Sequence, residues 1–333
     1  MSVHQRLKVA EPTAARPGPG LLPETLLRTL DVNLARRVEG LLAGDYRARL
    51  IGLGTELAQI RPYDPETDDV RHIDWKATAR TGVPHVRTQL ADRILVTWIV
   101  LDGTPSMEFG TADRRKADVA EGVALALGYS ATRRGNKLGT VVFGPRGTTA
   151  LRPRQGRPGM MGLIAALRGQ PAVIPGDTLA RALRITGKLA RQRALVVVVS
   201  DFRGDRDWRR PLLEVAGRHE VICVEVRDPR EQELPDAGEL RLVDPETGRQ
   251  LRVNTASAVL RRRFAAAAAE ERRTLAAMLA GAGVRHVVVS TEGDWLRTLT
   301  GFLRARPLSH RLDGGAQSAK VPALPASERA PAR

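Results

Sequence analysis

Several oxygen-bearing side chains stand at spacings that suit a hard metal ion. Asp102, Thr104 and Ser106 alternate directly after one apolar run, and Asp201 follows a second apolar run. Carboxylate and hydroxyl oxygens suit Mg²⁺, Mn²⁺ or Ca²⁺ better than zinc. Thr178, which precedes an expected helix, is a further source of oxygen. Two carboxylates leave such an ion undercoordinated, so the pattern predicts a site that can accept a carboxylate from outside.

Each of these residues, taken alone, has an ordinary structural explanation. Aspartate and serine commonly follow buried strands, and Thr178 can simply cap a helix. The joint pattern is more specific: DxTxS after one strand, a capping threonine, and an aspartate after a later strand. Asp102 is also compatible with a phosphatase that uses an aspartyl nucleophile. That chemistry expects a second acid two residues later, where Thr104 stands.

The donors converge only if the two apolar runs are neighbouring strands of one sheet. Short runs rich in valine and isoleucine predict strands at 94–101, 138–143, 149–152, 195–200, 220–226 and 285–290. Helical spacing covers 114–134, 160–168, 179–192, 208–218, 257–280 and 295–304. Apolar strands alternating with helices predict an α/β fold with a doubly wound, mostly parallel sheet. Such a sheet binds ligands outside the carboxyl ends of its strands, where the winding reverses.

Two short connections indicate hairpins. The linker GPRGT is too short for a parallel crossover, so it predicts an antiparallel strand on one edge of the sheet. The turn sequence DPETG predicts a second hairpin at 240–253, inserted before the long helix. A separate amphipathic helix is expected at 25–42, where leucines recur at helical spacing.

Composition divides the chain into four parts. Residues 1–24 and 307–333 are rich in proline, glycine and alanine and are expected to be flexible tails. Residues 25–92 hold the N-terminal helix and a charged motif, and residues 93–306 form the α/β domain. No apolar run approaches the roughly 20 residues that span a bilayer, and no secretory signal of the ordinary form is present. We therefore expect a cytoplasmic protein.

The net charge of +16 invites a nucleic-acid interpretation. The arginines are spread along the whole chain, however, and aromatic residues make up only 4% of it, so few stacking partners are available. Nucleic-acid binding is therefore the less favoured alternative. Sequences for a P-loop, a GxSxG elbow or an HExxH zinc site are missing from the chain.

The oxygen pattern resembles the metal-ion-dependent adhesion site of von Willebrand factor type A domains, whose fold also has a single antiparallel edge strand. By that resemblance Asp102, Thr104 and Ser106 match the first motif, Thr178 the second and Asp201 the third. The family usually has serine where Thr104 stands, and threonine keeps the oxygen. The resemblance implies a bound Mg²⁺, Mn²⁺ or Ca²⁺ and a protein partner that supplies an acidic side chain.

A second stretch resembles the signature of the bacterial "domain of unknown function 58" family. It reads RPYDP at 61–65, DDVRHIDWKATAR at 68–80 and VR at 86–87. Family members usually have glycine before the paired acids, where this chain has Glu66 and Thr67. The resemblance implies an adhesion-site-like domain and a MoxR-type AAA ATPase as partner.

The signature mixes both charges over a short stretch, which predicts an ion-pair network around its tryptophan that pins the segment to the sheet. A docking surface for a partner is the alternative. The residues concerned are Asp68, Asp69, Arg71, Asp74, Trp75, Arg80 and Arg87.

The sequence thus favours a non-catalytic, divalent-metal-dependent protein-binding module. A metal-dependent phosphoester hydrolase that uses the same carboxylates stays open as an alternative, as does an arginine-rich nucleic-acid-binding protein.

Overall fold

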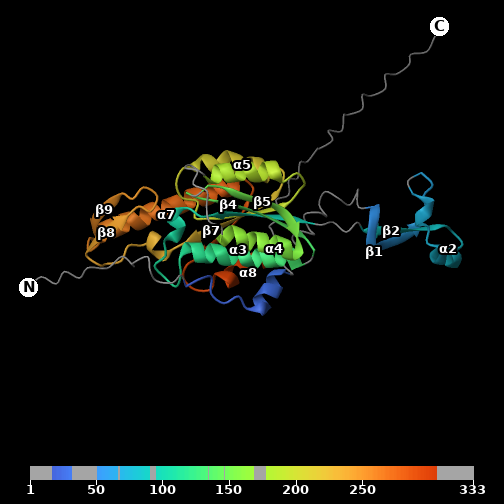
Figure 1. The fold of residues 1–333 in the computed structure, drawn as a ribbon, viewed down its shortest axis with the longest axis horizontal. Helices are drawn as coiled ribbons and strands as arrows, with labels where there is room; N and C mark the ends of the chain where they lie inside the picture. Colours follow the sequence, from blue (N-terminus) through green and yellow to red (C-terminus); the bar gives the residue numbers. More distant parts are fainter. Residues whose placement is uncertain are drawn as a thin grey trace, which may run out of the picture.

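The structure, a computed structural model, describes residues 17–31, 51–66, 68–90, 95–133, 135–145, 147–168 and 178–305. Its largest sheet has six strands in the order β10-β7-β6-β3-β4-β5 (Figure 1). These are β3 (Val96–Asp102), β4 (Lys137–Phe143), β5 (Thr149–Gln155), β6 (Leu195–Ser200), β7 (Glu220–Arg227) and β10 (Arg285–Ser290). All neighbours in this sheet pair in parallel except β4 and β5. The predicted mostly parallel sheet with one antiparallel edge strand is confirmed.

The winding of the sheet reverses between β3 and β6. The chain runs from β3 through helix α3 (Lys116–Arg133) to β4 and β5 on one side. It returns through α4 (Gly156–Arg168) and α5 (Leu179–Leu189) to β6 on the other side of β3. Leu101 pairs with Val199, so the carboxyl ends of these two strands lie side by side. The two predicted halves of the oxygen pattern therefore follow neighbouring strands at the switch point.

Each face of the sheet has its own apolar core because successive strand side chains point to opposite faces. Ile99 and Val197 belong to the core shared with α3, α4 and α8 (Trp295–Arg304). Trp98 and Val198 belong to the core shared with α5, α6 (Arg209–Ala216) and the end of α7 (Ala258–Gly281). Figure 1 shows α5 on the face of the sheet opposite α3, α4 and α8. The six predicted helices are thus confirmed, and they cover both faces of the sheet, α7 with its end only.

The N-terminal segment packs on the first of these cores. Residues 24–31 are helical, and the side chain of Leu30 is 0% exposed. The indole Nε1 of Trp295 donates to the carbonyl oxygen of Pro19 at 3.0 Å. Pro19 lies in the stretch that the sequence favours as a tail. The remainder of the predicted helix, residues 32–42, falls outside the described residues.

The family signature lies in a small antiparallel sheet that sequence analysis did not predict. β1 (Ile51–Pro62) pairs with β2 (His85–Leu90). Between them lie the short 3-10 helix η1 (Val70–His72) and the helix α2 (Trp75–Thr81). The register of β1 shifts between Ile51 and Glu56, and this irregularity disguises the strand in the sequence.

The second predicted hairpin is confirmed as β8 (Glu239–Val243) paired with β9 (Gln250–Asn254). It leads into α7, whose buried residues are Leu275 and Leu279 near its end. The hairpin and the first half of α7 project past the sheet in Figure 1. Among the described residues, no helix combines the length and the apolar content needed to cross a bilayer.

The packing of Trp98 on β4 can be tested at a single glycine. A Cβ added at Gly139 would lie 2.7 Å from the Trp98 ring, whereas one added at Gly162 of α4 would meet its nearest atom at 3.6 Å. We expect Gly139→Ala to lower the free energy of unfolding in urea by about 1–3 kcal/mol through overpacking. Gly162→Ala, the matched control, should raise it by up to about 1 kcal/mol through helix propensity. Equal stability of the two variants would contradict the packing.

Candidate metal site

The loop after β3 brings three of the predicted donors together. Asp102 Oδ1 accepts hydrogen bonds from Thr104 N at 2.9 Å and from Thr104 Oγ1 at 2.6 Å. Thr104 Oγ1 lies 3.1 Å from Ser106 Oγ. The short 3-10 helix η2 (Pro105–Glu108) begins directly after Thr104 and fixes Ser106, which is buried. The spacing of DxTxS therefore places one carboxylate and two hydroxyls in a single turn of chain.

Asp102 is held between two strand ends. Its Oδ2 accepts from Ser200 Oγ, at the end of β6, at 2.5 Å. Burial and the nearby charge of Asp201 raise the pKa of Asp102 to about 6, although hydrogen bonds from Ser200 and Thr104 act against the shift. Two buried carboxylates that repel each other are stabilised by a cation, so this electrostatic setting suits a bound ion.

The turn after β6 has an unusual backbone. Phe202 has a φ of 54°, the single positive value at a non-glycine residue in the described chain. The Ser200 hydroxyl accepts from Phe202 N at 2.9 Å, and Asp201 Oδ1 accepts from Arg203 N at 3.1 Å. A non-glycine residue in this conformation is costly, so these bonds hold Asp201 in a fixed position.

Lys116 is the main residue that sequence analysis missed. Its Nζ lies 2.6 Å from Asp201 Oδ2 and 2.6 Å from Glu231 Oε1, and its side chain is 0% exposed. Glu231 ends the short 3-10 helix η4 (Pro229–Glu231) after β7. Lys116 is the first residue of α3, where the helix dipole disfavours a cation. The two carboxylates offset that cost, and Asp201 is therefore already neutralised from within the chain.

Thr178 makes its hydrogen bond to a residue outside the Asp102 loop. It precedes α5, is exposed, and its hydroxyl donates to Asp207 Oδ2 at 3.4 Å. Within the described part of the chain, this hydrogen bond joins Thr178 to η3 (Arg206–Trp208) and not to the loop of Asp102. The same part of the chain holds no cluster of three or more His, Cys, Asp or Glu side chains suited to a metal.

The donor chemistry therefore fits a hard divalent cation at part of the predicted site. Asp102, Thr104 and Ser106 converge and offer oxygen atoms alone. Asp201 stands beside them but is engaged by Lys116, and Thr178 is engaged elsewhere. That all five residues hold one ion stays a prediction.

A glutamate from a distant hairpin also contacts the loop. Glu246 Oε1 accepts a hydrogen bond from the backbone N–H of Ser106 at 2.9 Å. Glu246 lies in the turn between β8 and β9. Sequence analysis recognised that turn by its DPETG residues, but nothing local indicated where its glutamate would point.

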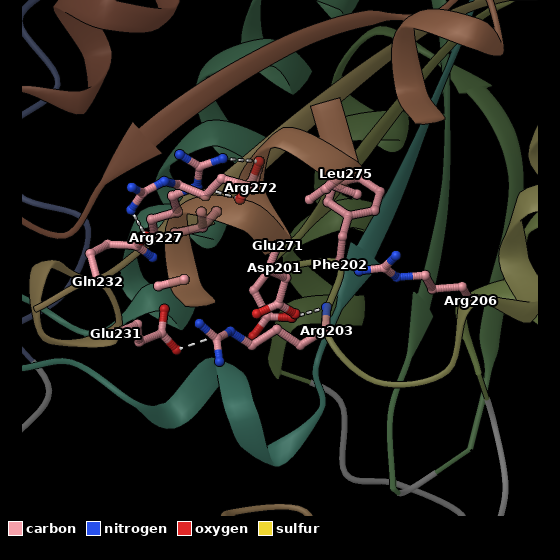
Figure 2. A pocket seen from close by; sticks show the side chains of 13 residues that line it. Asp201, Phe202, Arg203, Arg206, Arg227, Glu231, Gln232, Glu271, Arg272 and Leu275 are labelled. Carbon is pink, nitrogen blue, oxygen red and sulfur yellow. Dashed lines mark hydrogen bonds and ion pairs between the residues drawn. The ribbon is translucent and has the colours of Figure 1, made fainter. Parts of the chain in front are cut away.

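A small pocket opens beside Asp201 on the side of α7 (Figure 2). Figure 2 shows Glu231 and the Arg203 guanidinium facing each other there, with Arg203 Nε 3.5 Å from Glu231 Oε1. The cavity volume is about 30 Å³. One water needs at least about 10–15 Å³, so the pocket has room for one or two waters.

Comparison with known proteins decides the family. The family model described as "Protein of unknown function DUF58" matches residues 59–274. The chain belongs to this family. It is 40% identical over 283 residues to uncharacterized protein Rv1480 of Mycobacterium tuberculosis and to uncharacterized protein Mb1516 of Mycobacterium bovis. Each match covers 84% of this chain and 88% of the relative.

Solved structures similar to this DUF58 chain include BatB from Bacteroides thetaiotaomicron. The TM-score is 0.41 at 14% identity, over 63% of this chain and 97% of BatB. The SpRpn10 VWA domain gives a TM-score of 0.37 at 11% identity, over 64% of this chain and 99% of that domain. We therefore assign the fold class from the strand order of this chain and not from these similar structures.

The acids of the DUF58 signature cap helices and pair with one arginine. Asp68 accepts from both terminal nitrogens of Arg61, at 2.8 and 2.6 Å. Asp69 caps η1 by accepting from Arg71 N at 2.9 Å. Asp74 caps α2 by accepting from Lys76 N at 3.0 Å and from Ala77 N at 3.2 Å. Three of the seven signature residues therefore shape the segment locally.

The expected ion-pair network around Trp75 stays a prediction. The side chain of Trp75 is 72% exposed. Arg71 and Arg80 are exposed, and Arg87 lies in β2 with its side chain outside the described residues. The observed role of Asp69 and Asp74 is to satisfy backbone N–H groups at helix starts.

The buried pair of Lys116 can be tested by stability. Lys116→Met keeps most of the side-chain volume but removes the buried cation that Asp201 and Glu231 share, so we expect the free energy of unfolding to fall by about 3–5 kcal/mol. Lys188→Met removes an exposed lysine on α5 and should change it by no more than about 0.5 kcal/mol. Urea denaturation measures both. Parent-like stability of Lys116→Met would show that the pair is not buried.

Proposed function

We propose that this DUF58 protein is a non-catalytic binding module that uses Mg²⁺, or Mn²⁺ or Ca²⁺, to take an acidic side chain from a partner protein. The observation that carries the proposal is the convergence of Asp102, Thr104 and Ser106 at the switch point, with a carboxylate already bonded to the Ser106 N–H. The fold and family are compatible with a protein-interaction module.

The roles of the residues follow from their contacts. Asp102, Thr104 and Ser106 would hold the ion, which when bound supplies a coordination position for an outside carboxylate. Ser200 keeps the Asp102 carboxylate in place, so little reorganisation is needed. The Ser106 N–H donates to the incoming carboxylate, as it does to Glu246. Lys116 fixes Asp201 and reduces the repulsion between the two acids.

The partner class comes from the family resemblance. We propose a MoxR-type AAA ATPase or one of its clients, acting in the assembly or maturation of protein complexes. The pocket beside Asp201, at about 30 Å³, is too small for a phosphoester, which favours binding over hydrolysis. The proposed site binds a carboxylate through a backbone N–H and hydroxyl groups. A nucleic-acid-binding protein would instead use arginines to bind phosphates.

Metal binding can be measured directly by the electron paramagnetic resonance signal of free Mn²⁺. The parent chain should bind Mn²⁺, and Asp102→Ala and Ser106→Ala should each weaken binding by roughly tenfold or more because each removes an oxygen donor. Ser130→Ala removes a buried hydroxyl on α3 that bonds to Asp31 and is the matched control. Equal Mn²⁺ affinity in Ser106→Ala and Ser130→Ala would contradict the proposed metal site.

Partner binding can be measured with a purified MoxR-type ATPase from the same organism. We expect the immobilised chain to retain it in Mg²⁺ and to lose it in EDTA, and we expect Asp102→Ala to retain less. Asp201→Asn and Thr178→Ala should also weaken capture if all five predicted donors act together. Asp201→Asn carries an additional stability loss through Lys116, so its folding has to be checked by circular dichroism. Capture that is unaffected by EDTA would exclude metal-dependent binding.

A further inference from the structure

The hairpin β8–β9 reaches across the chain to the candidate site. Its Glu246 lies 140 residues from Ser106 in sequence, yet Glu246 Oε1 is 2.9 Å from Ser106 N. We propose that Glu246 is an internal ligand that occupies the acid-accepting position until the acid of a partner replaces it. This inference rests on the proposed function and specifies how the same site is regulated and what it recognises.

The turn is built to present Glu246. Asp244 Oδ1 accepts from Glu246 N at 3.0 Å, and Asp244 Oδ2 accepts from Thr247 Oγ1 at 2.5 Å. The carbonyl of Asp244 accepts from Gly248 N at 2.8 Å, and Gly248 has a φ of 70°. These bonds make a defined turn, so the Glu246 carboxylate is held outward at the tip of the hairpin.

The charges around the loop make this contact informative. The loop already holds the carboxylate of Asp102, whereas Asp201 is paired with Lys116, so the charge of Asp102 repels a further acid unless something specific binds that acid. The Ser106 N–H supplies that specific contact beside the Thr104 and Ser106 hydroxyls. The position is therefore one that accepts carboxylates in spite of the local negative charge.

The contact between Glu246 and Ser106 costs little free energy to break. Every residue from Val243 to Leu251 is exposed, including these two apolar side chains at 48% and 58%. Withdrawal of the tip uncovers no core and breaks one charge-assisted hydrogen bond to Ser106. The closed arrangement is therefore stable enough to compete with a partner and weak enough to yield to it.

The base of the insertion is fixed, in contrast. Glu231 binds Lys116 at 2.6 Å, and Thr255 N and Thr255 Oγ1 donate to the Gly238 carbonyl at 2.7 and 2.8 Å. Thr255 is fully buried, including the backbone N–H and the hydroxyl that make these two bonds. The hairpin therefore remains attached beside the site while its tip leaves.

The way in which Glu246 is presented also indicates which partner would fit the site. The site accepts a glutamate at the tip of a slim, exposed turn, so a partner acid has to be presented in a similar way. The chemistry expected of the partner is an acidic turn or loop.

Hydrogen exchange tests the contact without metal or partner. In Glu246→Ala we expect the Ser106 amide to exchange roughly tenfold faster or more than in the parent, because its acceptor is removed. The Thr104 amide, which donates to Asp102, is the internal reference and should not change. Glu239→Ala removes an exposed glutamate from the base of the same hairpin and is the matched control. Identical Ser106 exchange in Glu246→Ala and the parent would overturn the inference.

A peptide probe tests the competition. We would use a fluorescent cyclic peptide with the sequence of residues 243–249, and the same peptide with glutamine at the position of Glu246. In Mg²⁺ the Glu246→Ala chain should bind the first peptide roughly tenfold more tightly than the parent does, and should not bind the second. Equal affinity of parent and Glu246→Ala for the first peptide would overturn the competition.

The two failures can be told apart. If the Ser106 amide exchanges at the same rate in Glu246→Ala and in the parent, while Mn²⁺ binding and ATPase capture are intact, Glu246 is not an internal ligand. The proposed function would then still hold. Faster Ser106 exchange without binding of the peptide to either chain would show that Glu246 is a structural contact only. That result would overturn both the inference and the acid-accepting function.

Discussion

The charge of one buried carboxylate, Asp201, constrains everything at the switch point. Asp201 follows β6 directly, where the sheet is covered on both faces, so its charge needs a partner within the protein. Lys116 provides it and also binds Glu231, both at 2.6 Å. One ammonium thereby joins the end of β6, the start of α3 and the start of the insertion that carries β8 and β9.

The two neighbouring strand ends are consequently unequal. Asp201 has a resident cation, whereas Asp102 is met by the hydroxyls of Ser200 and Thr104 and by the Thr104 N–H. Burial and the proximity of Asp201 raise the pKa of Asp102 to about 6, so its negative charge is the incompletely balanced one. A cation, or an acid that arrives with a cation, therefore finds its place on the β3 side. The asymmetry is the reason for placing the proposed ion at the loop of Thr104 and Ser106 rather than at the turn after β6.

The sequence predicted the sheet well because its strands are short apolar runs buried on both faces, as Val196 to Val199 illustrate. Asp102, Thr104 and Ser106 could also be predicted, since their spacing is local. Lys116 and Glu246 could not, because their partners lie 85 and 140 residues away and neither residue belongs to a local pattern. In the signature, the capping role of Asp69 and Asp74 could not be predicted, because a capping aspartate and an ion-paired aspartate look the same in sequence.

The insertion between β7 and α7 couples the two halves of the site. Its first residues bind Lys116 through Glu231, which is buried against the Asp201 side, and its tip binds the Asp102 side through Glu246. Breaking the Glu231–Lys116 contact would leave charged groups without a partner inside the protein. Breaking the Glu246–Ser106 contact releases an exposed turn into water. Movement is therefore confined to the tip, and the base keeps the tip close to its position after release. High local concentration of the tip then makes reclosure fast, so an acid from a partner has to bind more tightly than a single hydrogen bond allows. That requirement is what a divalent cation at Asp102, Thr104 and Ser106 would meet, because it adds a strong contact that the hairpin does not need in order to close.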